Sequence, residues 1–408
     1  MARALHPCGR ALILLLNASL CMAQASALDR VLAESVRLRQ TKLPPQPTFW
    51  EELKDARDRS ATLRAALRDW VESLLPRSKT ALDSQLQSTN TKLQADLLGS
   101  QLIAPGKGGE FTPGLVSAIQ LSRPPEAPDK VVVTVGISVP CGVDDAVYIY
   151  DYSQGRPLRV LESHGTRNHD ESISGVRFSK RDSQGGQLIL TLRYGVQCGS
   201  SWNSLSYNLF QLSPATGAAV PLYAGEQGIW FGDDDAYELR LDPAELLLQV
   251  IDRSIDAAIH SRPHVLHFKT DGSTTERVDP VALQPHDFAD EWLTRPWPEM
   301  ESRSSESGRD VLKEWHRRLT GGYISGEFQF VQQCREPTDQ WQIGIELFSV
   351  KGKELPKPLK LYFLVLSSGK YRFKMVDVSR IRQPDCPRNS YPNERGPTLF
   401  PAAEEKRP

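Results

Sequence analysis

Hydrophobic residues recur at helical spacing in three segments near the start of the chain. The apolar stripes are Leu28, Val31, Leu32 and Val36, then Leu63, Leu67, Trp70, Val71 and Leu74, and then Leu82, Leu86, Leu93 and Leu97. Apolar positions three and four residues apart form one face of an α-helix. Thr48 with Glu51 forms a capping box before the second helix, and Ser78 can cap the third. The pattern predicts a helical region over residues 28–103, packed on itself or on the next domain, or alternatively serving as a docking or coiled-coil arm.

From residue 115 to about residue 293 the hydrophobic period changes to two. Apolar runs alternate with clusters of Gly, Pro, Asp and Ser, which is the pattern of strands and turns. Equivalent strands begin near Val131, Gln187 and Leu246, at intervals of 56 and 59 residues. The matching turn glycines are Gly155, Gly217 and Gly272. This rhythm predicts three units, each with four strands.

The first two units also share sequence. Residues 131–142 read VVVTVGISVPCG and residues 188–199 read LILTLRYGVQCG, and each run ends in Cys-Gly before an aromatic strand. Four-stranded meanders that repeat every ~40–60 residues resemble the blades of β-propellers. The resemblance covers residues 115–293 and implies a propeller-like domain. Three blades are too few to close a ring, so either the C-terminal region supplies another meander or the domain is a β-sandwich with repeat-like hairpins.

The last part of the chain has a different composition. Residues 294–309 are rich in Ser, Glu and Pro, and we expect a linker there. Residues 310–386 combine one short helix with three or four strands, which predicts a small α+β domain or a fourth meander. Residues 387–408 predict a flexible tail. The predicted fold class is therefore mainly β, with an α-helical N-terminal region, propeller-like four-stranded meander repeats and a small C-terminal α+β domain.

The first residues have the composition of a secretory signal peptide. Arg3 and Arg10 supply positive charge, and residues 11–20 form an apolar run that is too short to span a bilayer. Small residues follow at Ala23, Ala25 and Ala27. This pattern predicts a signal peptide over residues 1–27, cleaved after Ala27 or Ala25, and export to the periplasm or the extracellular space. The mature chain would then have no transmembrane helix.

Two alternatives to simple cleavage remain. Cys21 could accept a lipid, although Leu20 stands where a lipoprotein signal needs a small residue. The segment could also stay uncleaved as an N-terminal anchor.

The charge balance and the cysteine content further narrow the possible classes of protein. The chain has 49 Lys and Arg against 50 Asp and Glu, and this balance argues against a general nucleic-acid binder. Four cysteines remain after the predicted cleavage, and an even number in an exported chain indicates two disulfides. Cys141 and Cys198 end equivalent strands, so we expect them to pair, and Cys334 with Cys386 would close the C-terminal sheet. None has the C-x-x-C spacing of zinc or thioredoxin-like sites.

The sequence contains few candidates for catalytic or metal-binding motifs. His264 and His267 lie on one predicted strand at an odd spacing, which places them on opposite faces. The acidic run at residues 233–235 follows Trp230 and Phe231, and it lacks the spacing of a calcium loop, so a hydrated turn is the better interpretation. No nucleophile elbow and no phosphate-binding loop occurs. We therefore predict no catalytic residue, no cofactor and no metal site.

Two functions from different classes fit this sequence. The first is an exported, non-catalytic protein that binds a protein or carbohydrate partner through the surface of its β repeats. The residues that could line such a surface are Tyr148, Tyr150, Trp202, Tyr207, Trp230, Phe231, Asp233 and Asp235, although the aromatic ones could equally fill the core. The second is an extracellular or periplasmic hydrolase that uses paired carboxylates.

Overall fold

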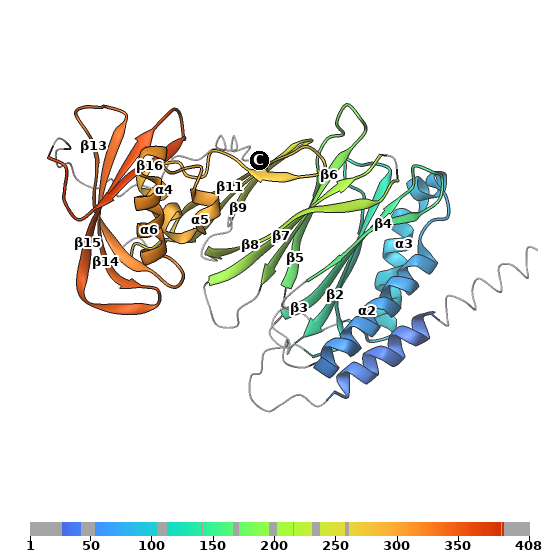
Figure 1. Ribbon diagram of the computed structural model, residues 1–408. Helices are drawn as coiled ribbons and strands as arrows, with labels where there is room; N and C mark the ends of the chain where they lie inside the picture. Colours follow the sequence, from blue (N-terminus) through green and yellow to red (C-terminus); the bar gives the residue numbers. More distant parts are fainter. Residues whose placement is uncertain are drawn as a thin grey trace, which may run out of the picture. The chain divides into compact units, whose positions relative to one another are not determined.

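A computed structural model describes residues 27–41, 54–103, 112–139, 142–165, 171–195, 202–214, 216–230, 237–257, 261–384 and 386. The chain divides into two compact units, residues 1–226 and residues 227–408 (Figure 1).

The helices of the first unit agree with the apolar stripes of the sequence. A first helix spans residues 27–39, α2 spans Lys54–Leu74 and α3 spans Lys79–Gly99. The Ser78 hydroxyl accepts a hydrogen bond from the Ala81 amide at 3.1 Å, which confirms the predicted cap of α3. The capping box at Thr48 and Glu51 lies outside the described residues. Figure 1 shows α2 and α3 covering one face of the adjacent sheet.

Two four-stranded meanders follow in the first unit. The first sheet consists of β1 (Val116–Ser122), β2 (Lys130–Val139), β3 (Gly142–Asp151) and β4 (Leu158–His164). The second sheet consists of β5 (Glu171–Phe178), β6 (Gln187–Gly195), β7 (Trp202–Leu212) and β8 (Ala219–Trp230). In both sheets the strands are neighbours in the order of the sequence.

Strand β2 is buried on both faces, which explains its nearly unbroken apolar run. Val131 and Val133 lie in the core that the first sheet shares with the helices. Val132 lies instead in the core that the first sheet shares with Phe178 and Ile189 of the second sheet. The first unit therefore consists of a helical layer and two sheets, with the first sheet in the middle.

The second unit also contains two four-stranded sheets. The third sheet consists of β9 (Tyr237–Asp242), β10 (Glu245–Arg253), β11 (Ser261–Thr270) and β12 (Thr275–Arg277). The fourth sheet consists of β13 (Ser325–Gln333), β14 (Gln340–Val350), β15 (Lys353–Ser367) and β16 (Phe373–Ser379). The helical segment between them comprises α4 (Pro285–Thr294), α5 (Trp297–Met300), a 3-10 helix (Glu306–Gly308) and α6 (Arg309–Leu319).

The predicted linker over residues 294–309 is instead a folded part of the second unit. Met300 is fully buried in the core of this unit. The Ser305 amide donates to the Met375 carbonyl at 2.8 Å, and the Met375 amide donates to the Arg303 carbonyl at 2.8 Å. Backbone hydrogen bonds to β16 and a few buried apolar side chains hold the segment in place. The segment therefore needs few apolar residues, and its composition resembles that of a linker.

The strand rhythm predicted from the sequence is confirmed. Gln187 and Leu246 lie in β6 and β10, the second strands of their sheets. Gly155, Gly217 and Gly272 all lie between third and fourth strands with positive φ, at +78°, +68° and +88°. These turns need glycine because a side chain disfavours that backbone conformation.

The implied propeller is not found. The described residues form four separate four-stranded sheets, with no closed barrel or propeller among them. One face of the first sheet is occupied by helices, where a propeller blade would face another blade. The third meander, which the sequence groups with the first two, lies in the second unit, where α4 contacts strands of both the third and the fourth sheet. The C-terminal sheet is a fourth meander, and α6 precedes it.

One of the two predicted disulfides lies within the described residues. Cys334, directly after β13, bonds to Cys386, and their Cα atoms are 4.0 Å apart. The pair is buried beside Leu364 and ties the segment after β16 back to the sheet. Cys141 and Cys198 lie outside the described residues, so their pairing stays a prediction.

Candidate binding pocket of the second unit

Helix α4 is the structural centre of the second unit because it presents different chemistry to the two sheets. Its apolar residues Phe288 and Trp292 contact Phe373 and Phe363 of the fourth sheet, with ring centroids 5.7 Å and 6.1 Å apart. Its carboxylates face basic residues of the third sheet instead. No face of α4 is left to solvent over residues 286–293, all of which are buried.

A buried ionic network joins α4 to the third sheet. Glu291 accepts hydrogen bonds from Arg262 at 3.0 Å, from Arg277 at 2.5 Å and from Arg295 at 3.1 Å. Arg262 also lies 3.0 Å from Asp290. Burial alone would raise the pKa of Glu291, but Arg277, His264 and Arg295 hold it well below its ordinary value. Glu291 is therefore a buried anion around which the basic residues are arranged.

His264 belongs to this network as a neutral ring. Arg295 donates to Nε2, so the ring proton lies on Nδ1, which is 2.8 Å from a Glu291 oxygen. Burial is the main cause that lowers the pKa of His264, to about 3. His267, on the opposite face as predicted, contacts Glu245 and the Asp279 carbonyl instead. The two histidines hold the structure together, and no group of metal-binding side chains occurs among the described residues.

A pocket of about 820 Å³ opens beside this network. It is formed by the end of β10, the turn from α4 to α5, the last turns of α6 and the segment that leads into β13. Its lining residues are Asp252, Arg253, Ser254, Ile255, Leu293, Thr294, Arg295, Pro296, Trp297, Lys313, His316, Arg317, Thr320, Gly321, Gly322, Tyr323, Ile324 and Lys351. Its size is in the range of small-molecule and peptide sites.

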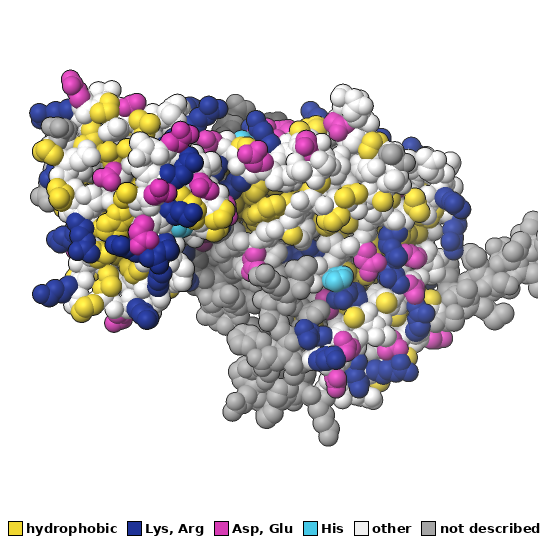
Figure 2. Space-filling model, in the orientation of Figure 1, with side chains coloured by type: hydrophobic (Ala, Val, Ile, Leu, Met, Phe, Trp, Pro, Cys, Tyr) yellow, Lys and Arg dark blue, Asp and Glu magenta, His cyan; other side chains and the backbone are white. Residues whose placement is uncertain are grey.

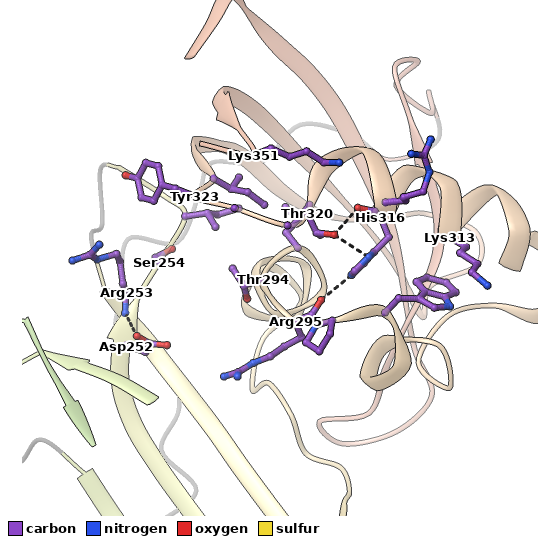
Figure 3. Close-up of a pocket in the computed structure, with 18 residues that line it drawn as sticks. Asp252, Arg253, Ser254, Thr294, Arg295, Lys313, His316, Thr320, Tyr323 and Lys351 are labelled. Carbon is purple, nitrogen blue, oxygen red and sulfur yellow. Dashed lines mark hydrogen bonds between the residues drawn. The ribbon is translucent and has the colours of Figure 1, made fainter. Parts of the chain in front are cut away.

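His316 fixes the wall of the pocket. Its Nε2 donates to the Arg295 carbonyl at 2.9 Å, and its Nδ1 lies 3.2 Å from the Thr320 hydroxyl (Figure 3). The ring packs edge-on against Trp292 and Trp297, with centroids 4.9 Å and 5.4 Å away. Burial lowers the pKa of His316. These contacts tie the end of α6 to the turn after α4 and so hold this wall of the pocket in place.

Asp252 is the acidic residue of the pocket lining. One carboxylate oxygen accepts from the Arg253 amide at 2.6 Å, and the other accepts from the Gln227 side chain. Burial raises the pKa of Asp252 to about 6, although Arg262 and Arg295 oppose this effect. Asp252 is therefore about half ionised near pH 6, and at neutral pH it is mostly a carboxylate that offsets one positive charge of the lining.

Basic residues outnumber acidic ones in the lining, five to one. Arg295 is used by Glu291, and Arg317 pairs with Glu314 at 2.7 Å. Lys313 and Lys351 have no ion-pair partner among the described residues. Figure 2 shows Lys and Arg side chains interspersed with hydrophobic and acidic ones on the visible face of the C-terminal part of the chain. The pocket thus combines apolar walls with surplus positive charge.

Three of the aromatic residues named from the sequence are buried. Tyr148, Tyr150 and Tyr207 are 1%, 2% and 3% exposed. Tyr150 donates from its hydroxyl to Glu72 of α2 at 2.9 Å, and Tyr207 stacks on Tyr223. These three tyrosines are core residues, as in the alternative interpretation of the sequence. The side chains of Trp202 and Trp230, and all of Phe231, Asp233 and Asp235, lie outside the described residues.

The pocket was not predicted from the sequence. Its residues come from segments between Asp252 and Lys351 that are brought together by the fold, and none of them forms a known motif. The sequence holds only local signals: a basic last turn of α6 (His316, Arg317, Arg318) followed by Gly321 and Gly322. Neither signal indicates a ligand site unless the three-dimensional structure is known.

Comparison of the sequence with models of protein families and with curated proteins finds no match. No helix in the described part of the chain is long and apolar enough to cross a membrane.

Proposed function

We propose that this protein is an exported, non-catalytic binding protein and that its ligand occupies the pocket of the second unit. The observation that carries the proposal is a pocket with apolar walls whose lining includes Lys313 and Lys351, two lysines with no ion-pair partner among the described residues. Such a lining favours an anionic ligand with an apolar part, because the charges give orientation and the apolar walls give affinity. The pocket replaces the tyrosine surface as the binding element.

Export is supported by two independent features. The signal-peptide pattern precedes the first described helix. The Cys334–Cys386 disulfide agrees with an oxidising compartment, where such bonds persist.

The geometry of His316 favours binding over catalysis. A general base needs a ring nitrogen that can reach the substrate proton. In His316, Nε2 is used by the Arg295 carbonyl, and Nδ1 faces Thr320, whose hydroxyl is also 2.8 Å from the His316 carbonyl. This is the arrangement of a side chain that ends a helix and joins two segments.

A hydrolase of the paired-carboxylate kind is the alternative. It requires two acids about 5–10 Å apart across the scissile bond. Among the described residues that line the pocket, Asp252 is the one carboxylate. The basic residues around it would favour binding an anionic product or substrate without supplying the second acid.

The proposal is tested with a ligand panel and product analysis. Acidic and basic peptides and acidic and neutral oligosaccharides are added to the purified protein, thermal unfolding is recorded, and the ligands are then examined by mass spectrometry. We expect anionic members to raise the unfolding temperature and to be recovered intact. Cleavage of a ligand, or no stabilisation by any anionic member, would contradict the proposal.

A matched pair of variants locates the site. Thr294 is exposed at the pocket, and Thr338 is exposed in a turn outside it. Thr294→Trp fills part of the pocket and should abolish the stabilisation, whereas Thr338→Trp should keep it. Equal stabilisation of both variants would place the ligand elsewhere.

A further inference from the structure

The fold places two lysines at the pocket, and neither is paired with an acidic side chain among the described residues. Lys351 sits in the β14–β15 turn with φ of +55°, and the next amide, of Gly352, donates to the Tyr323 carbonyl at 2.8 Å. The turn can approach so closely because residue 322 is glycine: a Cβ there would lie 2.8 Å from the Lys351 carbonyl carbon. Lys313, exposed on α6, has no ion-pair partner among the described residues. The backbone thus carries Lys351 to the pocket.

The cations lie along the pocket and not at one point. Figure 3 shows Arg253 and Tyr323 at one end and Lys313 at the other, with Lys351 on a separate segment. A compact anion such as phosphate would be matched by converging donors. Spread cations match a ligand whose negative charges are several residues apart.

The walls between these cations are apolar and aromatic. Ile255, Leu293 and Ile324 line the pocket, and Tyr323 at its rim is 59% exposed. Trp297 adds an aromatic wall to the pocket. Aliphatic and aromatic walls accommodate an apolar side chain of a ligand.

We propose that the ligand is an extended acidic peptide segment of a protein partner, with an apolar side chain between its acidic residues. This inference rests on the proposed function and names its partner class. The acidic side chains face Lys313 and Lys351, and the apolar side chain lies against Trp297 and its neighbours. The volume of about 820 Å³ accommodates a few residues.

Fluorescence anisotropy with labelled peptides tests the inference. The main probe is a short peptide with glutamates on both sides of one phenylalanine. Its controls replace the glutamates with lysines or the phenylalanine with glycine, and an acidic oligogalacturonate serves as a competing saccharide. We expect the main probe to bind strongly and the controls to bind weakly. Binding of the main probe should weaken as the NaCl concentration rises from about 0.05 M to about 0.5 M.

Charge-reversal variants give the decisive comparison. Lys313→Glu and Lys351→Glu should each weaken binding about tenfold or more. Lys374→Glu reverses an exposed lysine of β16 outside the pocket and should leave binding unchanged within about twofold. Thermal unfolding of every variant checks that it is folded, and Lys313→Gln and Lys351→Gln replace any that is not.

Each outcome bears on the inference. Equal affinity of the pocket variants and Lys374→Glu overturns it, as does equal binding of the phenylalanine and glycine peptides. If the oligogalacturonate binds, is lost in Thr294→Trp, and no peptide binds, the peptide inference fails while the proposed function stands. If no anion of either kind binds, both fail.

Discussion

Replacing Asp287 with asparagine should change how the stability of the second unit depends on pH. Asp287 lies in the first turn of α4 and is 2% exposed. One of its carboxylate oxygens has no hydrogen-bond partner among the described residues. Burial raises the pKa of Asp287 to about 7; Arg262 opposes the rise, and the neighbouring Asp290 and Glu291 add to it.

The size of the effect follows from this pKa. The ordinary value is 3.8, so the difference is about three pH units, each worth about 1.36 kcal/mol. The folded state holds the proton more tightly than the unfolded state. The stabilisation is therefore complete below pH 4 and is lost as the pH rises to about 7, by about 4 kcal/mol in total.

Two buried histidines act in the opposite direction. Burial lowers the pKa of His264 to about 3 and that of His286 to about 4. Their contribution to stability is present above their ordinary value of 6.5 and is lost as the pH falls below it. The wild-type curve is then flattened by opposing effects, and only a variant separates the contribution of Asp287.

The assay is urea unfolding of the wild type and Asp287→Asn between about pH 4 and pH 8. Relative to the wild type, the variant should gain about 4 kcal/mol in unfolding free energy across this range. Asp310→Asn, at an exposed position in the first turn of α6, is the control and should run parallel to the wild type. A constant difference between Asp287→Asn and the wild type would refute the reasoning.

Three further predictions test other parts of the structure. Cys386→Ser opens a loop of 52 residues, and urea unfolding should show a loss of about 4 kcal/mol relative to the wild type; an unchanged midpoint would exclude this disulfide. Arg64→Met removes the buried partner of Asp144, 2.5 Å away, and should cost about 3 kcal/mol, part of which Asp144→Asn in the same chain restores; additive losses would contradict the pairing. N-terminal sequencing of the secreted protein should begin at Ser26 or Leu28, and retention of Met1 or a lipid on Cys21 would disprove cleavage after Ala25 or Ala27.

The strand order could be predicted because its signals are local. Alternating hydrophobicity marks a strand in any context, and the glycines at 155, 217 and 272 mark turns that require positive φ. These two signals locate the strands of three meanders whatever the packing of the sheets.

The arrangement of the sheets could not be predicted, because it depends on contacts between distant segments. The linker prediction failed where composition was used in place of contacts: a Ser-, Glu- and Pro-rich stretch is held by Met300 and by backbone pairing to Met375. The tyrosine surface failed for a similar reason. Tyr148 and Tyr150 lie on a strand that has α2 above it, and period-two patterning cannot show whether a face is covered.

The pocket could not be predicted either. Lys351 reaches it only because Gly322 permits a close approach of two turns that are 29 residues apart in sequence. Lys313 reaches it because His316 joins α6 to the Arg295 carbonyl. Each residue is ordinary in the sequence, and only the fold brings them together.

Hydrogen–deuterium exchange with a saturating anionic ligand tests the central claim most directly, because it reports protection along the whole chain and so locates the binding site without assuming one. The account predicts slower exchange in peptides that cover residues 252–255, 293–297 and 313–324, with little change in the first unit. Protection confined to strands of the first unit, or no protection at saturation, would contradict the claim that this pocket is the binding site.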